Sequence, residues 1–234
     1  MFSIYKRELK GYFTSPIGYA VVAAIVFFAS LFFILANIAS DSSDMSGLFQ
    51  SLIVIFVFLI PVLTMRTFSE EKRQKTDQLW LTAPVSLFGV VFGKFLAALT
   101  VYAIGLSSTV IFALVLGAAG TVQTWVIVGN IVGMLLLGAA LIAVGVFLSN
   151  VTESQVVAAV LSIVVLLLLY FFSNLTQLTS NATLQAVIKA LSISERYNNF
   201  AAGIFDLSDT FFYLSVSALF LFFTTRMLEK RRWS

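Results

Sequence analysis

Long apolar runs alternate with short polar segments along the whole chain. Six uncharged runs, none with Asp, Glu, Lys or Arg, approach or exceed the roughly 20 residues that a helix needs to cross a bilayer core of ~30 Å. They cover residues 17–38, 48–65, 95–119, 124–149, 155–175 and 210–225. A backbone in lipid must satisfy its own hydrogen bonds, and the ~10-residue alternation of barrel strands is not seen. The pattern predicts an all-α integral membrane protein with six transmembrane helices in a single domain, residues 1–234.

The charged residues between these runs are distributed unevenly. An even number of spans places both termini on the same side of the membrane. That side receives twelve lysine and arginine residues, and the other side receives only Lys189 and Arg196. Because the cytoplasmic loops of membrane proteins carry the excess of lysine and arginine, we expect both termini in the cytoplasm.

The first 15 residues are amphipathic. Aromatic and aliphatic side chains alternate with the charged residues Lys6, Arg7, Glu8 and Lys10. This pattern predicts a helix that lies in the membrane interface and breaks near Gly11. Pro16 then begins the first transmembrane helix, with Thr14 or Ser15 as its cap. A plain membrane anchor is the alternative interpretation.

Residues 66–84 hold a dense group of charges of both signs. Glu71 and Lys75 have the i,i+4 spacing of a stabilising pair, so we expect a short helix that stands off the membrane and ends before Pro84. A bilayer alone does not require so much charge of both signs, which favours a soluble protein partner at this segment. The alternative is a solvated loop that only orients the chain.

Residues 176–209 are too polar to span the membrane again. Within them, helical i, i+3, i+4, i+7 spacing predicts an amphipathic helix over about 183–192 and is carried by Leu184, Val187, Ile188 and Leu191. We expect this outer segment to cap the mouth of the bundle or to dip partly into it. A loop without a role is the alternative.

In the fourth apolar run, Gly129 and Gly133 are spaced for close helix packing. We expect packing within the subunit, with a contact between subunits as the alternative.

Composition narrows the possible functions. Hydrophobic residues make up 60% of the chain and charged residues 11%, which excludes a soluble enzyme of this size. The chain has no His and no Cys, so Ser-His-Asp hydrolysis and His- or Cys-ligated metals are excluded. Gly89, Gly93 and Lys94 lack the spacing and the Ser/Thr of a nucleotide-binding loop. The spans carry no ionisable group of the kind that ion-coupled transporters use. We therefore expect no catalytic residue, no metal, no bound cofactor and no nucleic-acid partner, and energy supplied by another protein.

Three blocks of sequence point to one family: YKRELKGYFTSP over residues 5–16, RTFSEEKRQKT over 66–76, and FAAGIFDLSDTFFY over 200–213. They resemble the membrane subunit of ABC-2 type ATP-binding-cassette transporters, and within it the gliding-motility-type permease branch. Pro84-Val-Ser86 and Gly93-Lys94 extend the second and most specific block. Two positions depart from the family pattern: Lys75 replaces a usual Gly, and Tyr197 replaces a frequent His.

The resemblance implies a bacterial inner-membrane permease that pairs with a copy or homologue of itself and with an ABC ATPase dimer, which binds ATP and Mg. The segment between spans 2 and 3 would be a cytoplasmic coupling helix that contacts the ATPase through Glu70, Glu71, Arg73, Lys75 and Thr76. An N-terminal elbow helix with Lys6, Arg7 and Glu8 would lie beside it. We expect Arg66 and Lys94 to meet lipid headgroups. The helical segment between spans 5 and 6 would form an outer gate or docking face with Tyr197, Phe200, Gly203, Asp206 and Asp209.

Three functions follow as hypotheses. The first is a permease subunit that couples ATP hydrolysis by a separate subunit to export, and the apolar spans favour a hydrophobic substrate. The second is a mechanotransmission or envelope-assembly module that passes motion to a partner with a large extracytoplasmic domain and transports no substrate. The third is a stand-alone channel or structural membrane protein. The sequence leaves the substrate, the direction and the identity of the second permease open.

Overall fold

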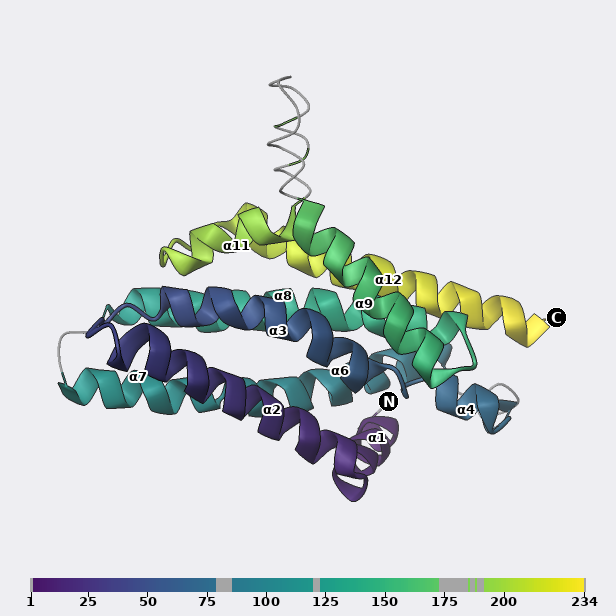
Figure 1. The fold of residues 1–234 in the computed structure, drawn as a ribbon. Helices are drawn as coiled ribbons and strands as arrows, with labels where there is room; N and C mark the ends of the chain where they lie inside the picture. Colours follow the sequence, from purple (N-terminus) through teal and green to yellow (C-terminus); the bar gives the residue numbers. More distant parts are fainter. Residues whose placement is uncertain are drawn as a thin grey trace.

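The computed structural model describes residues 2–78, 86–119, 123–172 and 192–233, together with Gln185 and Ile188. These residues form helices and short connections, and no strand occurs among them (Figure 1). The helices of the first half are α1 (Phe2–Thr14), α2 (Pro16–Phe33), the π-helix η1 (Ile34–Ile38), α3 (Ser46–Thr64) and α4 (Ser69–Arg73). Those of the second half are α6 (Leu87–Leu106), α7 (Ser108–Ala119), α8 (Thr124–Val151), α9 (Gln155–Phe171), α11 (Ile193–Ala201) and α12 (Leu207–Trp233). The helix expected over 183–192 and the stop before Pro84 lie outside the described residues.

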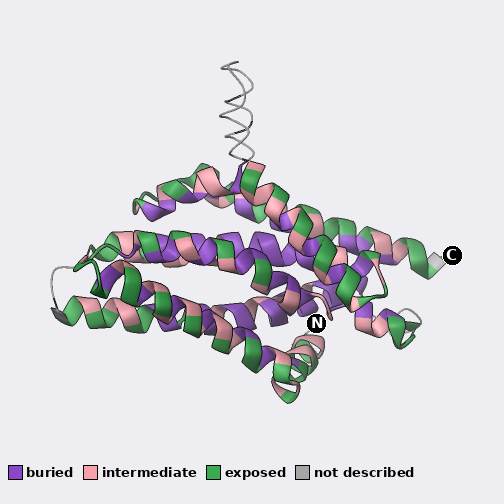
Figure 2. Ribbon diagram, viewed as in Figure 1, coloured by how far each residue is buried: buried purple, intermediate pink, exposed green. Residues whose placement is uncertain are grey.

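The long helices run side by side, and both termini lie at the same end of the bundle (Figure 1). We call this the charged end; it holds α1, α4 and the last turn of α12. α8 is the central helix, because it packs against α3, α6, α9, α11 and α12. Figure 2 shows buried residues along the facing sides of α3, α6 and α8 and exposed residues on the outer sides of the bundle.

Five helical segments are long and apolar enough to cross a membrane. They are Pro16–Ile38, Ser46–Arg73, Leu87–Ala118, Thr124–Val151 and Leu207–Arg232. The fifth expected span, 155–175, corresponds to α9, an apolar helix of 17 residues that is therefore shorter, about 26 Å at 1.5 Å per residue. Residues 173–175 lie outside the described part of the chain, so the count of six stays a prediction.

Two boundaries differ from the expectation. α6 begins at Leu87 rather than at residue 95, so Lys94 lies inside a helix and not before it. α1 runs through Gly11 without a break and ends at Thr14. The chain turns instead at Ser15, whose backbone is extended (φ −101°, ψ 157°), because the residue before a proline disfavours the helical region.

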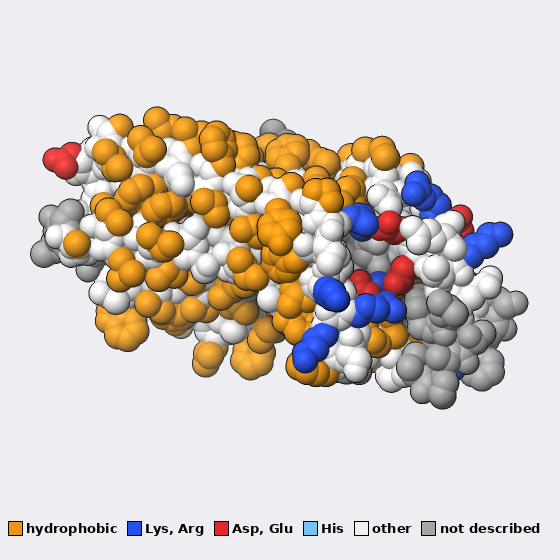
Figure 3. Space-filling view, turned by 90° about the horizontal axis from the view of Figure 1, so that it is seen from below, with side chains coloured by type: hydrophobic (Ala, Val, Ile, Leu, Met, Phe, Trp, Pro, Cys, Tyr) orange, Lys and Arg blue, Asp and Glu red, His pale blue; other side chains and the backbone are white. Residues whose placement is uncertain are grey.

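The outer surface is apolar over most of the length of the bundle. Figure 3, a view from below the orientation of Figure 1, shows hydrophobic side chains covering most of that face; lysine and arginine side chains gather toward one end together with acidic ones, and an acidic side chain also lies at the other end. Bulky residues such as Phe27, Val156 and Phe211 are exposed on α2, α9 and α12. Water does not favour so large an apolar surface, whereas a lipid environment accepts it.

The two glycines of α8 make an internal contact. A Cβ at Gly133 would lie 2.6 Å from Phe200 Cβ, and a Cβ at Gly129 would lie 2.6 Å from the Phe200 carbonyl oxygen. Only residues without a side chain permit this approach of α11 to α8. The expectation of packing within the subunit is confirmed.

Candidate functional site

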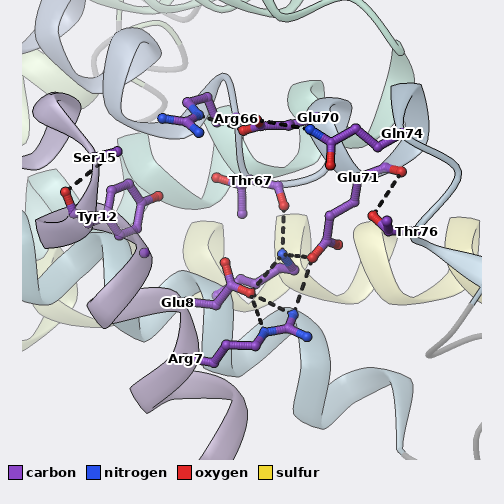
Figure 4. Close-up of a pocket in the computed structure, with 12 residues that line it drawn as sticks. Arg7, Glu8, Tyr12, Ser15, Arg66, Thr67, Glu70, Glu71, Gln74 and Thr76 are labelled. Atoms are coloured by element: carbon purple, nitrogen blue, oxygen red, sulfur yellow. Dashed lines mark hydrogen bonds and ion pairs between the residues drawn. The ribbon is translucent and has the colours of Figure 1, made fainter.

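A buried lysine joins three helices at the charged end. The side chain of Lys94 in α6 is only 1% exposed. Its Nζ lies 3.2 Å from Glu8 Oε1 of α1 and 3.0 Å from Glu71 Oε1 of α4, and it donates a hydrogen bond to the Thr67 carbonyl at 2.8 Å. Figure 4 shows the Glu8 and Glu71 side chains converging from α1 and α4. The expectation that Lys94 meets lipid headgroups is wrong, because two carboxylates and a carbonyl already neutralise and solvate its charge.

Arg7 completes this network. Its guanidinium contacts Glu8 Oε1 at 2.8 Å and Glu71 Oε1 at 3.2 Å. The hydrogen bonds that Arg7 donates to the Glu8 carboxylate raise the pKa of Arg7 above its usual value, against a smaller lowering by partial burial. Two cations and two carboxylates therefore balance in one cluster, which links α1, α4 and α6. We call Arg7, Glu8, Glu71 and Lys94 the charge cluster.

A cavity of about 310 Å³ opens beside the charge cluster, between α1 and the turn that precedes α4. Tyr12 lies on its α1 side and donates a hydrogen bond from its hydroxyl to the Leu63 carbonyl at 3.1 Å. Burial raises the pKa of Tyr12 to about 12, so the hydroxyl stays protonated and keeps its donor. Arg66 on the other wall pairs with Glu70 at 2.6 Å, one turn along the chain.

The opposite side of α4 is attached to the end of α8. Ser149 Oγ accepts hydrogen bonds from the backbone N–H of Phe68 (3.1 Å) and Ser69 (3.3 Å). The same hydroxyl donates to the Met65 carbonyl at 3.0 Å. Lys72 in turn donates from Nζ to the carbonyl of Asn150 in the last turn of α8, where the helix dipole favours a cation. α4 is therefore held from both sides and does not stand apart from the bundle.

A short turn of this segment, at the end of α4, is exposed. Residues 73–76 are exposed, whereas Lys72 and Asp77 on either side are buried. Lys75 has a left-handed backbone (φ 56°), which explains why a glycine suits this position. The expected helical pair of Glu71 with Lys75 is not the arrangement found, because the helix ends at Arg73 and Glu71 turns inward to the charge cluster. We call residues 73–76 the α4 tip.

The structure thus divides the expected contact residues into two groups. Arg73, Lys75 and Thr76 lie on the exposed tip, and Glu70 is partly exposed beside Arg66. Glu71 belongs instead to the charge cluster, together with Arg7 and Glu8 of the expected elbow. Lys6 is exposed on α1, with its Nζ 4.9 Å from the Phe2 ring centroid. Sequence reasoning missed the roles of Lys94, Tyr12 and Ser149, whose partners are distant in the chain.

The expected outer residues lie at the opposite end, mostly in buried contacts. Tyr197 donates its hydroxyl to Asn130 Oδ1 of α8 at 2.6 Å, and Phe200 packs on Gly133. Asp209 is 4% exposed and pairs with Arg196 at 2.7 Å.

Two further outer residues mark the turn that follows α11. Gly203 follows the end of α11 with a positive φ of 75°, and Asp206 is exposed and caps the start of α12 through the Ser208 N–H at 2.8 Å. Among the described residues, no group of three or more acidic residues is placed to hold a metal ion.

Comparison with known proteins assigns the chain to a family. Residues 2–228 match the family described as ABC-2 family transporter protein, which is nearly the whole chain. A comparison with curated proteins found no match. The family consists of membrane subunits of transporters, generally without a nucleotide site of their own, and it implies an ABC ATPase partner in general. With the apolar bundle and its charged end, this match shows that the chain belongs to the ABC-2 family of transporter membrane subunits.

Proposed function

We propose that this chain is the transmembrane permease subunit of an ATP-driven exporter and that a separate ABC ATPase drives it through α4. The observation that carries the proposal is the mounting of α4. Its tip is exposed at the charged end, while its body is tied to α1 and α6 by the charge cluster and to α8 by Ser149 and Lys72. A push on the tip therefore reaches three helices at once.

The strength of these ties supports a rigid transmission. Breaking a buried ion pair by removal of one partner costs about 3–5 kcal/mol, and stranding a buried backbone group costs about 1–3 kcal/mol. Both kinds of contact hold α4, so an external force moves the attached helices before it detaches the segment. The proposal places both termini and α4 in the cytoplasm of a bacterial cell and includes six spans, two permease subunits and an ATPase dimer.

The packing of the bundle supports a proposal for the substrate class. The interior is filled by large side chains such as Phe56, Tyr102 and Met134, which are fully buried. A transport path would then run between two permease subunits, along surfaces that are mainly apolar. We therefore propose a hydrophobic substrate. An Asp scan along the exposed positions of α9, beginning at Val160, would block export and spare ATPase activity if this path exists.

Affinity purification of the tagged chain in mild detergent, followed by mass spectrometry, tests the assignment. We expect an ABC ATPase in roughly equal amount. Reversal of the tip charges, Arg73→Glu with Lys75→Glu, should abolish the co-purification of the ATPase. Arg226→Glu on α12, which also replaces an arginine by a glutamate, is the control and should leave the ATPase bound. Glu71 is unsuitable for this test, because its reversal also breaks the pairs with Arg7 and Lys94.

Recovery of the chain alone, in a preparation where a control ABC complex survives, would refute the proposal. An additional envelope subunit in the same preparation would favour the mechanotransmission alternative. The narrower assignment to the gliding-motility-type branch, with its partner of large extracytoplasmic domain, stays a prediction.

A further inference from the structure

A second hollow lies at the charged end, on the side of α4 that faces the C-terminus. It has a volume of about 520 Å³ and is formed by the α4 tip, the connection between α8 and α9, and the last turn of α12. Five of the side chains that line it are lysine or arginine and two are carboxylates, which leaves a net charge of +3. The charge cluster is neutral by comparison.

A buried carboxylate joins the two basic elements of this hollow. Asp77, directly after the α4 tip, has a side chain only 7% exposed, and its Oδ2 lies 3.4 Å from Arg231 Nη1 of α12. This pair connects residues that are 154 positions apart in the chain. It places the end of α12 against the tip, so Arg73, Lys75, Arg231 and Arg232 contribute to a single surface.

The position of the hollow along α12 argues against a lipid headgroup as its occupant. Arg226 is the first charged residue at this end of α12, and its guanidinium lies 5.0 Å from the Phe222 ring centroid. Arg231 and Arg232 follow five and six residues later, about 8–9 Å further along the helix axis. The headgroup layer on each side of a bilayer is only about 5–8 Å deep. If Arg226 marks the edge of the hydrocarbon, the hollow therefore opens at or beyond the outer limit of the headgroups.

The mixture of charges in the hollow also favours a protein, and not a lipid headgroup, as its occupant. Asp77 and Glu153 stand among the cations and would repel lipid phosphates, whereas a folded protein surface can present both signs in register. Among the described residues, no hydrogen bond or ion pair is formed by the side chain of Arg73 or of Lys75. The tip therefore offers cations that a partner can meet.

We propose that this hollow receives an acidic segment of the ATPase, so that the last turn of α12 is a second part of the docking surface. The inference rests on the proposed function and names the chemistry of the partner surface. An acidic loop or helix of the ATPase would contact the tip and Arg232 together. Motion of the ATPase would then act on α12 directly, in addition to its action through α4.

The test measures binding of the purified ATPase subunit to the full-length chain in nanodiscs of neutral phosphatidylcholine, at low and at physiological salt. Arg232→Glu should weaken binding about tenfold and reduce its salt dependence, since exposed ion pairs are modest and screened. Arg226→Glu, on the same helix but at the lipid level, should leave affinity within about twofold. Elution as the same monodisperse species on size exclusion verifies that each variant is folded.

The outcomes separate the two proposals. If the wild-type chain does not bind the ATPase, the proposed function fails and this inference fails with it. If wild type binds, Lys75→Glu weakens binding and Arg232→Glu does not, only the role of α12 is refuted. If Arg232→Glu has no effect in neutral nanodiscs but weakens binding in nanodiscs with anionic lipid, the arginine serves the membrane and the inference is again refuted.

Discussion

Replacement of Lys94 by Met tests how far the charge cluster holds α1, α4 and α6 together. Met has nearly the same length and no charge, so the packing within α6 is kept while Glu8 and Glu71 lose a common cation. Removal of one partner from a buried pair costs about 3–5 kcal/mol. Both carboxylates are 19% exposed and Arg7 still contacts each of them, so we expect a cost at or below the lower end of that range, about 2–3 kcal/mol.

The assay is thermal unfolding of the purified chain in detergent, followed by intrinsic fluorescence. For a domain of 150–250 residues, 1 kcal/mol corresponds to about 2–4 °C, so Tm should fall by about 4–12 °C. Lys94→Met with Glu71→Gln restores the balance of one cation and one carboxylate and should recover at least half of the loss. Lys10→Met, an exposed lysine of α1, is the matched control and should change Tm by less than about 2 °C. A single variant as stable as wild type, or a double variant no better than the single, would refute the reasoning.

Three further variants test other contacts by the same unfolding assay. Gly133→Ala should lower stability by about 1–3 kcal/mol, because the new Cβ would lie 2.6 Å from Phe200 Cβ. The control Gly117→Ala, whose Cβ would have nothing within 4 Å, should be neutral or stabilising by up to about 1 kcal/mol. Equal effects of the two variants would contradict the close packing. Tyr197→Phe leaves Asn130 Oδ1 without its hydrogen-bond donor and should lower stability by about 1–3 kcal/mol. The double variant with Asn130→Leu should lose less stability than the two single variants together, and additive losses would show that the pair is not coupled. Lys75→Gly should raise stability by about 0.5–1 kcal/mol, since glycine adopts the left-handed backbone without strain. The same variant should weaken ATPase binding. A loss of stability would contradict the inference that the backbone of Lys75 is strained.

The apolar runs were sufficient to predict the long helices, because span length and the lack of charge are properties of local sequence. Pro16 marked the start of α2 for the same reason: its fixed φ acts on the adjacent residue. Lys94 could not be placed in this way. A single lysine beside an apolar run has the same pattern whether it ends a span or lies within one, and the carboxylates that stabilise it are 86 and 23 residues away.

The candidate site was predictable as a segment but not in its orientation. Dense charge of both signs identified residues 66–84, yet the i,i+4 rule paired Glu71 with Lys75. The signal that was available is Lys75 itself, which occupies a position where the resemblance places glycine and therefore a left-handed turn. Such a turn ends the helix and frees Glu71 for partners elsewhere. Ser149 carried no local signal, since a serine at the end of an apolar helix is common and its acceptor role depends on the arrival of α4.

The order of residues in the charge cluster has a consequence for biosynthesis. Both carboxylates that neutralise Lys94 precede it in the chain, so the ribosome delivers Glu8 and Glu71 before the lysine leaves the exit tunnel. When α6 enters the bilayer, the carboxylates of Glu8 and Glu71 have already been synthesised and can pair with Lys94. This pairing offsets the free-energy cost of placing a lysine in a membrane helix during insertion. The attachment of α4 to Ser149 must wait until α8 has been synthesised. α4 is therefore attached in two steps, first to α1 and α6 through the charge cluster and later to the central helix α8.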